Sequence, residues 1–233
     1  MTPRKYTVKV VDHSNPSTTF HRVMFEVEEV DKFEFIPGQF VALRVDHNKV
    51  NDYSIASLPE GNRFELIVDV KPGHEGSYFI HELRPGDKAG ILGPCGTFVL
   101  HKDEEVEEIL FLATGSGIAP LKVMTEQFLT QWLDPRKLHL YFGLRNCEDI
   151  FLYDYFDELM KKFKKFTFTP CLSRPDIFWE RDCGHITELL ENDYKKGAKL
   201  AAYLCGNKLM IEQAKEILLS IGTPQEKIYH EAF

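Results

Sequence analysis

The spacing of the apolar residues changes near residue 104, and this change limits the folds that the chain can adopt. Before that point apolar and polar residues mostly alternate, as they do over 6–10, 23–27 and 64–70. An alternation with a period of two is typical of strands with one buried face. Turn-forming clusters separate these segments, such as HSNPS at 13–17 and RPGD at 84–87. The first half is therefore predicted to be an antiparallel β-barrel or sandwich.

Beyond the acidic stretch at 103–108, continuous apolar runs alternate with segments of helical period. The runs that fit buried strands are ILFLA (109–113), LHLYF (138–142), FTFTPC (166–171), LAAYLC (200–205) and the final KIYHEAF (227–233). Such alternation is typical of a parallel sheet with helices on both faces. We therefore predict two domains, an antiparallel β domain over 1–102 and a five-stranded parallel α/β domain over 103–233.

The composition excludes several classes of protein. Of the 233 residues, 43% are hydrophobic and 27% are charged, which suits a globular protein with a buried core. The net charge of −8 opposes binding to nucleic acid, and no apolar run approaches the roughly 18 residues that cross a membrane. The five cysteines are far apart and lack metal-ligand spacing, so we expect free thiols, no metal site and a cytoplasmic location. A monomer is expected.

The glycine-rich segment TGSGIAP (114–120) follows the first buried strand of the second domain and opens its first helix. Glycines let the backbone approach a ligand closely, and the N–H groups of a helix N-terminus attract phosphate. The segment is neither a P-loop nor a G-x-G-x-x-G fingerprint, because no GK[ST] follows and Pro120 occupies the third glycine position. It is therefore interpreted as a site for a phosphorylated ligand, with a purely structural turn as the alternative.

Three segments of the first half also contain residues suited to ligand binding, in the order NDYSIAS (51–57), GHEGSYF (73–79) and GPCGTF (93–98). A strand that ends in Tyr53 and Ser54 offers a ring to stack on a planar ligand and a hydroxyl to orient it. Each segment by itself has a structural explanation, as strand residues, a helix start or a hairpin. Their order, followed by TGSGIAP and by CGN (205–207) before the last helix, is more specific.

This order resembles that of the ferredoxin–NADP(+) reductase superfamily, and the resemblance extends over essentially the whole chain. It implies a Greek-key β-barrel that binds FAD, with FMN as the alternative flavin. It also implies a second domain that binds NADPH or NADH, so that a hydride passes from the nicotinamide to N5 of the flavin.

The resemblance assigns the flavin to residues of the first domain. Tyr53 would stack on the isoalloxazine, and Ser54 would hydrogen-bond near N5. Gly76 and Ser77 would place a helix N-terminus on the pyrophosphate.

One residue departs from the family pattern. Family members typically carry Arg two residues before the Tyr, where its guanidinium pairs with flavin phosphate, whereas this chain has Asn51. Either the flavin binds more weakly here, or another cation, such as Lys71 or His74, replaces the Arg.

The resemblance assigns the dinucleotide to the ends of predicted strands in the second domain. The residues that would hold its pyrophosphate side are Thr114, Gly115, Ser116, Gly117 and Pro120. Arg145 follows the second strand, and Cys205 with Gly206 would lie beside C4 of the nicotinamide. Ser173 and Arg174 follow the third strand, where an arginine suits a 2′-phosphate, so NADPH is favoured over NADH.

The end of the chain is similar to that of relatives whose last residues return to the active site. Phe233 would then cover the flavin face, and Glu231 would assist proton delivery, with Ser54 and Cys205 as the other catalytic residues. A solvated chain end is the alternative for Glu231 and Phe233, and a buried strand-end role is the alternative for Cys205. The basic run KKFKK (161–165) either docks an acidic carrier or, as we favour, is a solvated helix end.

The favoured function is an FAD-dependent oxidoreductase that delivers electrons from NAD(P)H to a small carrier such as ferredoxin or flavodoxin. Asn51 favours a different enzyme, a reductase of free flavin. The chain could also be the reductase component of a multi-protein oxygenase or, as the least favoured function, a non-catalytic binding module.

Overall fold

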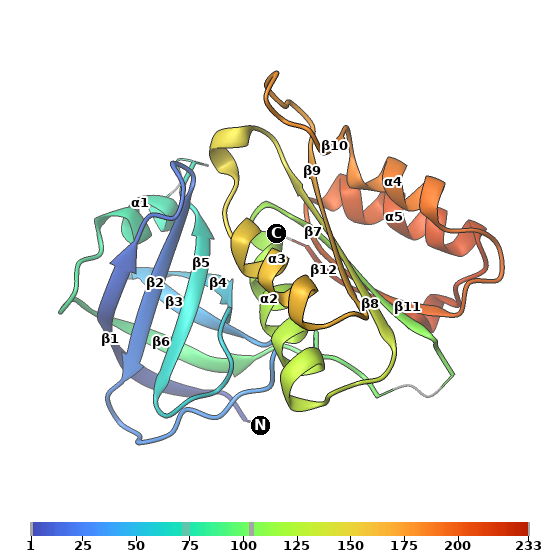
Figure 1. Ribbon diagram of the computed structural model, residues 1–233. Helices are drawn as coiled ribbons and strands as arrows, with labels where there is room; N and C mark the ends of the chain where they lie inside the picture. The colour runs from blue at the N-terminus through green and yellow to red at the C-terminus, as the bar shows by residue number, and fades with distance from the viewer. Residues whose placement is uncertain (1, 72, 74, 103–104, 233) are drawn as a thin grey trace. The chain divides into compact units, whose positions relative to one another are not determined.

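The computed structural model in Figure 1 describes residues 2–71, 73, 75–102 and 105–232, which form two compact units. The first unit comprises Met1–Leu100 and Lys122–Gln127. The second unit comprises His101–Leu121 and Phe128–Phe233. Both units contain a six-stranded sheet, which is antiparallel in the first unit and parallel in the second.

The first unit is a curled antiparallel sheet, which confirms the predicted barrel fold. Its strands are β1 (Arg4–Ser14), β2 (Phe20–Val27), β3 (Phe40–Asp46), β4 (Lys49–Ser54), β5 (Arg63–Asp69) and β6 (Lys88–Cys95), in the spatial order β4-β3-β6-β1-β2-β5. The sheet curls because Ile55, just after β4, bridges to Leu66 of β5 at the opposite edge. Alternate residues such as Val23, Phe25 and Val27 are buried in its core, as the period of two predicts. Helix α1 (Glu75–Glu82) packs against β2, β3 and β5.

The second unit is a parallel sheet with helices on both faces, as predicted. Its strands are β7 (Glu108–Thr114), β8 (Lys137–Leu144), β9 (Phe166–Leu172), β10 (Asp182–Cys183), β11 (Leu200–Gly206) and β12 (Ile228–Ala232), in the order β10-β9-β8-β7-β11-β12. Helices α4 (Ile186–Asp193) and α5 (Lys208–Ser220) cover one face, and α3 (Tyr153–Lys162) covers the other. The sheet has six strands rather than the expected five, because the two-residue β10 pairs with the end of β9. A strand of two residues is too short to leave a periodic signal.

Helix α2 (Ile118–Glu126) follows the glycine-rich segment, and its last residues belong to the first unit. Lys122 Nζ donates hydrogen bonds to Ala56 O at 2.9 Å and to Glu126 Oε1 at 2.8 Å. The same ammonium lies 3.8 Å from Glu65 Oε1, whose side chain is only 4% exposed. Met124 packs against Gly38. A buried ion pair and an apolar contact therefore hold the segment Lys122–Gln127 within the first unit.

None of the described helices is long and apolar enough to cross a membrane.

Candidate functional site

Strand β4 carries three predicted flavin-binding residues, Asn51, Tyr53 and Ser54. Because side chains alternate along a strand, Lys49, Asn51 and Tyr53 share one face of β4, and Ser54 points to the other. Ser54 is buried, and no described residue forms a hydrogen bond with its Oγ. Burial raises the pKa of Tyr53, although a hydrogen bond from Asn51 Nδ2 at 3.4 Å acts in the opposite direction. The Tyr53 hydroxyl therefore stays protonated at neutral pH.

The first turn of α1 lies directly against this face of β4 at Gly76. A Cβ atom at Gly76 would overlap Asn51 Nδ2 and would lie 2.6 Å from Tyr53 Oη, so a larger residue does not fit there. Ser77 is buried, and its Oγ donates to Asp69 O at 3.5 Å. A helix N-terminus leaves backbone N–H groups unpaired, and these attract phosphate.

The β4–α1 region has the features that a flavin phosphate ester requires. On one face of β4 it combines a half-buried aromatic ring at Tyr53 with a helix N-terminus at Gly76, and on the other face, at the last residue of the strand, Ser54 carries a buried hydroxyl for which no described residue is a hydrogen-bond partner. An aromatic ring can stack on a planar ring system, and a buried hydroxyl without a partner is costly unless a ligand supplies one. The residues present therefore fit a flavin.

The segment TGSGIAP forms the predicted turn between β7 and α2. Gly115–Gly117 is one turn of 3-10 helix, and α2 begins at Ile118. Gly115 has a φ of +57°, a left-handed conformation that glycine adopts without strain. Pro120 lies in the first turn of α2, where its missing N–H costs no helical hydrogen bond. The turn therefore presents the N–H groups of a helix start at the carboxyl end of β7.

The end of β11 lies against this turn. A Cβ atom at Gly117 would overlap Cys205 O and would lie 2.8 Å from Gly206 N. Gly206 has a φ of +138°, and a Cβ atom there would overlap Thr114 Oγ1. In addition, Asn207 N donates a hydrogen bond to Thr114 Oγ1 at 3.0 Å. The structure thus brings together the two segments that the sequence assigned to the dinucleotide.

Cys205 and Glu231 are neighbours on adjacent strands, because β11 and β12 pair in parallel with these two residues in register. Cys205 is fully buried. Burial, and then the negative charge of Glu231, raise the pKa of the Cys205 thiol well above its ordinary value. The thiol therefore keeps its proton at neutral pH and does not act as a thiolate nucleophile. Phe233, which we expected to cover the flavin, lies outside the described residues.

Arg145 and Arg174 follow the neighbouring strands β8 and β9 and are held together through their backbones. Ser173 N donates to Leu144 O at 3.0 Å, and Arg174 N donates to Arg145 O at 2.8 Å. Both arginine side chains are exposed, just beyond the carboxyl ends of β8 and β9. Two cations at these strand ends offer a site for an anionic group.

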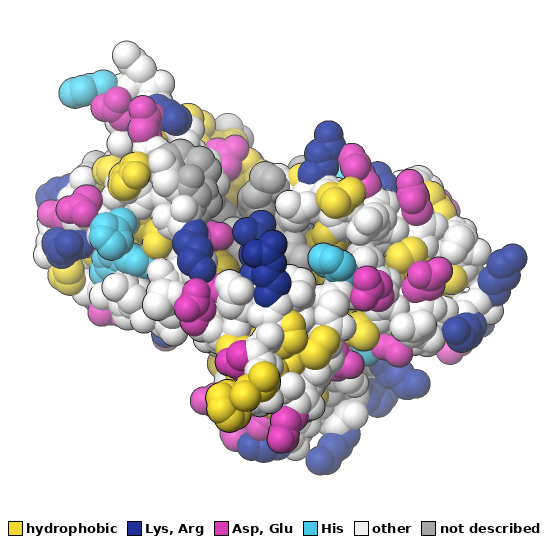
Figure 2. All heavy atoms as spheres, turned by 90° about the horizontal axis from the view of Figure 1, so that it is seen from above, with side chains coloured by type: hydrophobic (Ala, Val, Ile, Leu, Met, Phe, Trp, Pro, Cys, Tyr) yellow, Lys and Arg dark blue, Asp and Glu magenta, His cyan; other side chains and the backbone are white. Residues whose placement is uncertain are grey.

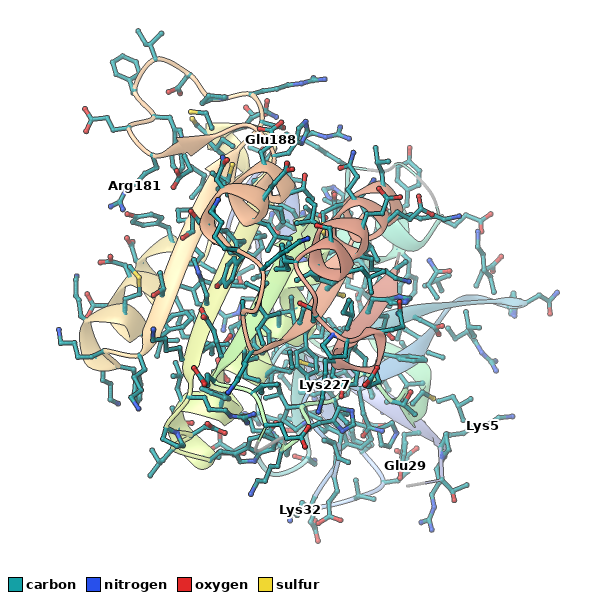
Figure 3. All side chains as sticks on the ribbon, turned by 90° about the vertical axis from the view of Figure 1, so that its right-hand side faces the viewer. Lys5, Glu29, Lys32, Arg181, Glu188 and Lys227 are labelled. Atoms are coloured by element: carbon teal, nitrogen blue, oxygen red, sulfur yellow. The ribbon has the colours of Figure 1, made fainter. Side chains whose placement is uncertain are left out.

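Between Arg174 and β10 the chain forms a projecting loop, at the foot of which Figure 3 labels Arg181. Its apolar residues Ile177 and Phe178 are 91% and 83% exposed. The Arg181 guanidinium lies over the Tyr153 ring, 5.6 Å from the ring centre. The base of the loop is therefore held against α3 by a side-chain contact.

The basic run KKFKK lies at the opposite end of the strands, just before the amino end of β9. Helix α3 ends at Lys162, and the run continues to Lys165, just before β9 begins. The Lys161 ammonium already pairs with Asp157 at 2.9 Å and with Glu158 at 2.7 Å. The run therefore lies at the amino end of β9, whereas the candidate dinucleotide residues Ser173 and Arg174 follow its carboxyl end. On the face that Figure 2 displays, lysines and arginines are interspersed with acidic side chains.

Two further residues of the candidate sites were missed by sequence reasoning. Asn207 caps α5, since its Oδ1 accepts a hydrogen bond from Leu209 N at 2.8 Å, and its own N–H reaches Thr114. The preference for Asn at helix N-caps is the signal that was available. Lys49 pairs with Glu75 at the start of α1, at 2.6 Å. The sequence signal for Lys49 was its spacing on the predicted strand, because it precedes Asn51 by two residues and Tyr53 by four and so shares their face.

Comparisons with known proteins match both units to protein families. Residues 7–100 match the oxidoreductase FAD-binding domain, and residues 111–216 match the oxidoreductase NAD-binding domain. The chain is 28% identical over 206 residues to the toluate 1,2-dioxygenase electron transfer component of Pseudomonas putida, covering 88% of this chain and 60% of that protein. It is 27% identical to the reductase component of a naphthalene 1,2-dioxygenase system from the same species, covering 96% of this chain and 67% of that protein.

Among solved structures, the Amycolatopsis cytochrome P450 reductase GcoB is similar to 99% of the length of this chain. The TM-score is 0.90, the identity is 26%, and 70% of that protein is covered. The chain spans about three fifths of the length of the first curated relatives that it matches.

Proposed function

This chain belongs to the ferredoxin–NADP(+) reductase superfamily, and we propose that it is an enzyme that takes a hydride from NADPH and passes electrons to a small carrier. The observation that carries the proposal is the presence, in one chain, of a β4–α1 region whose residues fit a flavin and of a glycine-rich turn that opens a helix after a buried strand. Each lies within a segment that matches the corresponding family domain.

The first unit would bind and orient the flavin. FAD, or FMN in its place, supplies a ring that accepts two electrons together and releases them singly. Tyr53 would hold that ring by stacking, and the Ser54 hydroxyl would gain a hydrogen-bond partner, which none of the described residues supplies. The backbone N–H groups of Gly76 and Ser77 would bind phosphate at the start of α1.

The second unit would bind and orient the nicotinamide dinucleotide. The turn from Thr114 to Pro120 would hold the pyrophosphate, since it exposes the N–H groups of a helix start. Cys205 would keep a proton on its Sγ, because burial raises its pKa. Glu231, in register beside it, would hold or deliver a proton at its carboxylate.

The pair of arginines favours NADPH over NADH. Arg174 is exposed beside Arg145 at the edge of the sheet and would pair with the 2′-phosphate that only NADPH carries. Replacing Arg174 with Ala should raise KM for NADPH about tenfold and leave KM for NADH unchanged. Equal effects on the two coenzymes would show that Arg174 does not select for the 2′-phosphate.

The proposed electron acceptor is a ferredoxin or flavodoxin, either free or as part of an oxygenase system. Two relatives are named as an electron transfer component and a reductase component of dioxygenase systems, which supports this class of acceptor. A cytoplasmic location is supported by the five cysteines, all of which are free thiols.

A reductase of free flavin is the second candidate function, and one observation favours it. Position 51 carries a neutral Asn where a phosphate-binding cation is expected, and the nearby Lys49 is already paired with Glu75. A weaker hold on phosphate would let the flavin leave after reduction. A non-catalytic binding module is the least favoured function.

The visible absorption spectrum of the purified protein tests the proposed function. A carrier reductase should show bound flavin that is bleached under anaerobic conditions faster by NADPH than by NADH. A colourless protein that oxidises NADPH only when FAD or FMN is added would be a free-flavin reductase. A colourless protein that remains inactive with added flavin would be a binding module.

A further inference from the structure

We infer that Lys49 is the cation that binds flavin phosphate in this protein, in place of the Arg that is missing at position 51, and that Glu75 weakens this binding. The inference rests on the proposed function, because it assumes that the β4–α1 region binds a flavin. It concerns two residues of the first unit, which approach each other from β4 and α1.

Lys49 is placed for this role by the alternation of β4. It lies on the same face as Asn51 and Tyr53, so one row of side chains runs from the stacking ring, through the neutral amide, to the ammonium. Strand residues rise about 3.3 Å each, so Lys49 begins about 7 Å beyond Asn51, which a lysine side chain spans. A lysine here can reach the region that an arginine at position 51 would have served.

The ion pair with Glu75 shows where the Lys49 ammonium lies. Lys49 Nζ is 2.6 Å from Glu75 Oε2, and Glu75 is the first residue of α1. The next residue, Gly76, packs directly on Asn51 and Tyr53. The ammonium is therefore held at the helix N-terminus whose N–H groups would bind the phosphate. Both side chains remain about half exposed, at 47% for Lys49 and 63% for Glu75, so the pair can open to admit a ligand.

The charges explain why Glu75 opposes binding. While the pair is closed, the ammonium and the carboxylate cancel, and the phosphate meets only the partial positive charge of the helix end. A phosphate dianion that binds there must share Lys49 with Glu75 and is repelled by that carboxylate. Removing the lysine should therefore weaken the binding of phosphorylated flavins, and removing the carboxylate should strengthen it.

Equilibrium binding of three flavins to the full-length protein, after removal of any bound flavin, separates the phosphate contribution. FMN differs from riboflavin only in its phosphate, whereas FAD also carries a second phosphate and an adenosine. Quenching of flavin fluorescence gives the Kd values, and the comparison of FMN with riboflavin isolates the phosphate contribution. The variants are Lys49→Gln and Glu75→Gln, and Lys71→Gln tests the neighbouring lysine. Lys88→Gln is the matched control, because Lys88 forms a similarly exposed ion pair with Glu28 at 2.7 Å on the same sheet.

We expect Lys49→Gln to raise Kd for FMN and FAD about threefold to tenfold, and Glu75→Gln to lower it by about threefold. Neither variant should change Kd for riboflavin, and both effects should shrink in high salt. Adding Asn51→Arg to Lys49→Gln should restore the affinity.

Three results would overturn the inference. They are an unchanged Kd for FMN and FAD in Lys49→Gln, an equal change for riboflavin, or a loss of affinity in Lys71→Gln but not in Lys49→Gln. In each case the wild-type protein still binds flavin, so the proposed function survives. If the wild-type protein binds none of the three flavins, the proposed function itself is wrong.

Discussion

Replacing Gly117 with Ala should weaken dinucleotide binding, because the position has no room for a Cβ atom. That atom would overlap Cys205 O and would lie 2.5 Å from Cys205 C and 2.8 Å from Gly206 N. Carbon contacts in proteins are about 3.5–4.0 Å, so the turn and the end of β11 must separate by about 1 Å. All three obstructing atoms belong to the backbone, and a rotamer change cannot relieve the overlap.

The expected cost follows from overpacking, which typically destabilises a protein by about 1–3 kcal/mol. The movement also displaces the N–H groups at the start of α2, so we expect Kd for NADP+ to rise at least tenfold. Urea unfolding measures the first effect, and isothermal titration calorimetry with NADP+ measures the second. Flavin binding should be unchanged, since Gly117 lies in the second unit.

Gly197→Ala is the matched control for this substitution. Gly197 belongs to the same unit and has a φ of +90°, but a Cβ atom there would meet nothing within 4 Å. Its replacement should cost about 1–2 kcal/mol for the left-handed backbone alone and leave Kd for NADP+ unchanged. If Gly117→Ala matches this control in stability and in Kd, the close contact between the turn and β11 does not matter for binding.

Three other predictions concern buried groups. Iodoacetamide at pH 8 should label the exposed Cys183 in the native protein and spare Cys205 until urea is added, because burial keeps the Cys205 thiol protonated and inaccessible; rapid labelling of Cys205, detected by mass spectrometry, would contradict this. Burial lowers the pKa of His139 from 6.5 to about 4. When the pH is lowered from 6.5 to 4, the unfolded chain therefore binds a proton at His139 before the folded protein does, and the free energy of unfolding should decrease. His139→Gln should flatten that slope in urea titrations, and an unchanged slope would refute the assignment. Lys122→Met should lower the free energy of unfolding by about 1–2 kcal/mol, because Ala56 O loses the Lys122 donor while the buried carboxylate of Glu65 still pairs with Arg22 at 2.6 Å; an unchanged free energy of unfolding would show that the Lys122 contacts are dispensable.

The periodic features of the chain were predictable from sequence because they depend on neighbours along the chain. Alternation at 23–27 gave a strand with a buried face, and the run at 109–113 gave the central strand β7. The glycine-rich turn could be placed because it lies between a buried strand and a helix. Local patterns of this kind indicate which type of element forms over a stretch of sequence.

The contacts between distant residues were not predictable in the same way. Lys49 and Glu75 are 26 residues apart, and no local pattern links a strand residue to the first residue of a later helix. The hydrogen bond between Asn207 and Thr114 spans 93 residues and forms only because β11 and β7 are neighbours in the sheet. The partners that position a site therefore depend on which strands and helices become neighbours in the fold. Patterns among residues close in sequence do not reveal those neighbours.

The segment Lys122–Gln127 has a consequence for attempts to divide this protein. It belongs to the first unit although more than twenty residues of the second precede it, so the first unit is discontinuous along the chain. A truncated protein that stops at residue 102 would lack the ammonium that faces Glu65 and the side chain that packs on Gly38. The half that matches the FAD-binding domain therefore depends on a segment outside its own stretch of sequence, and exchanging it between relatives would require the end of α2 to be exchanged with it.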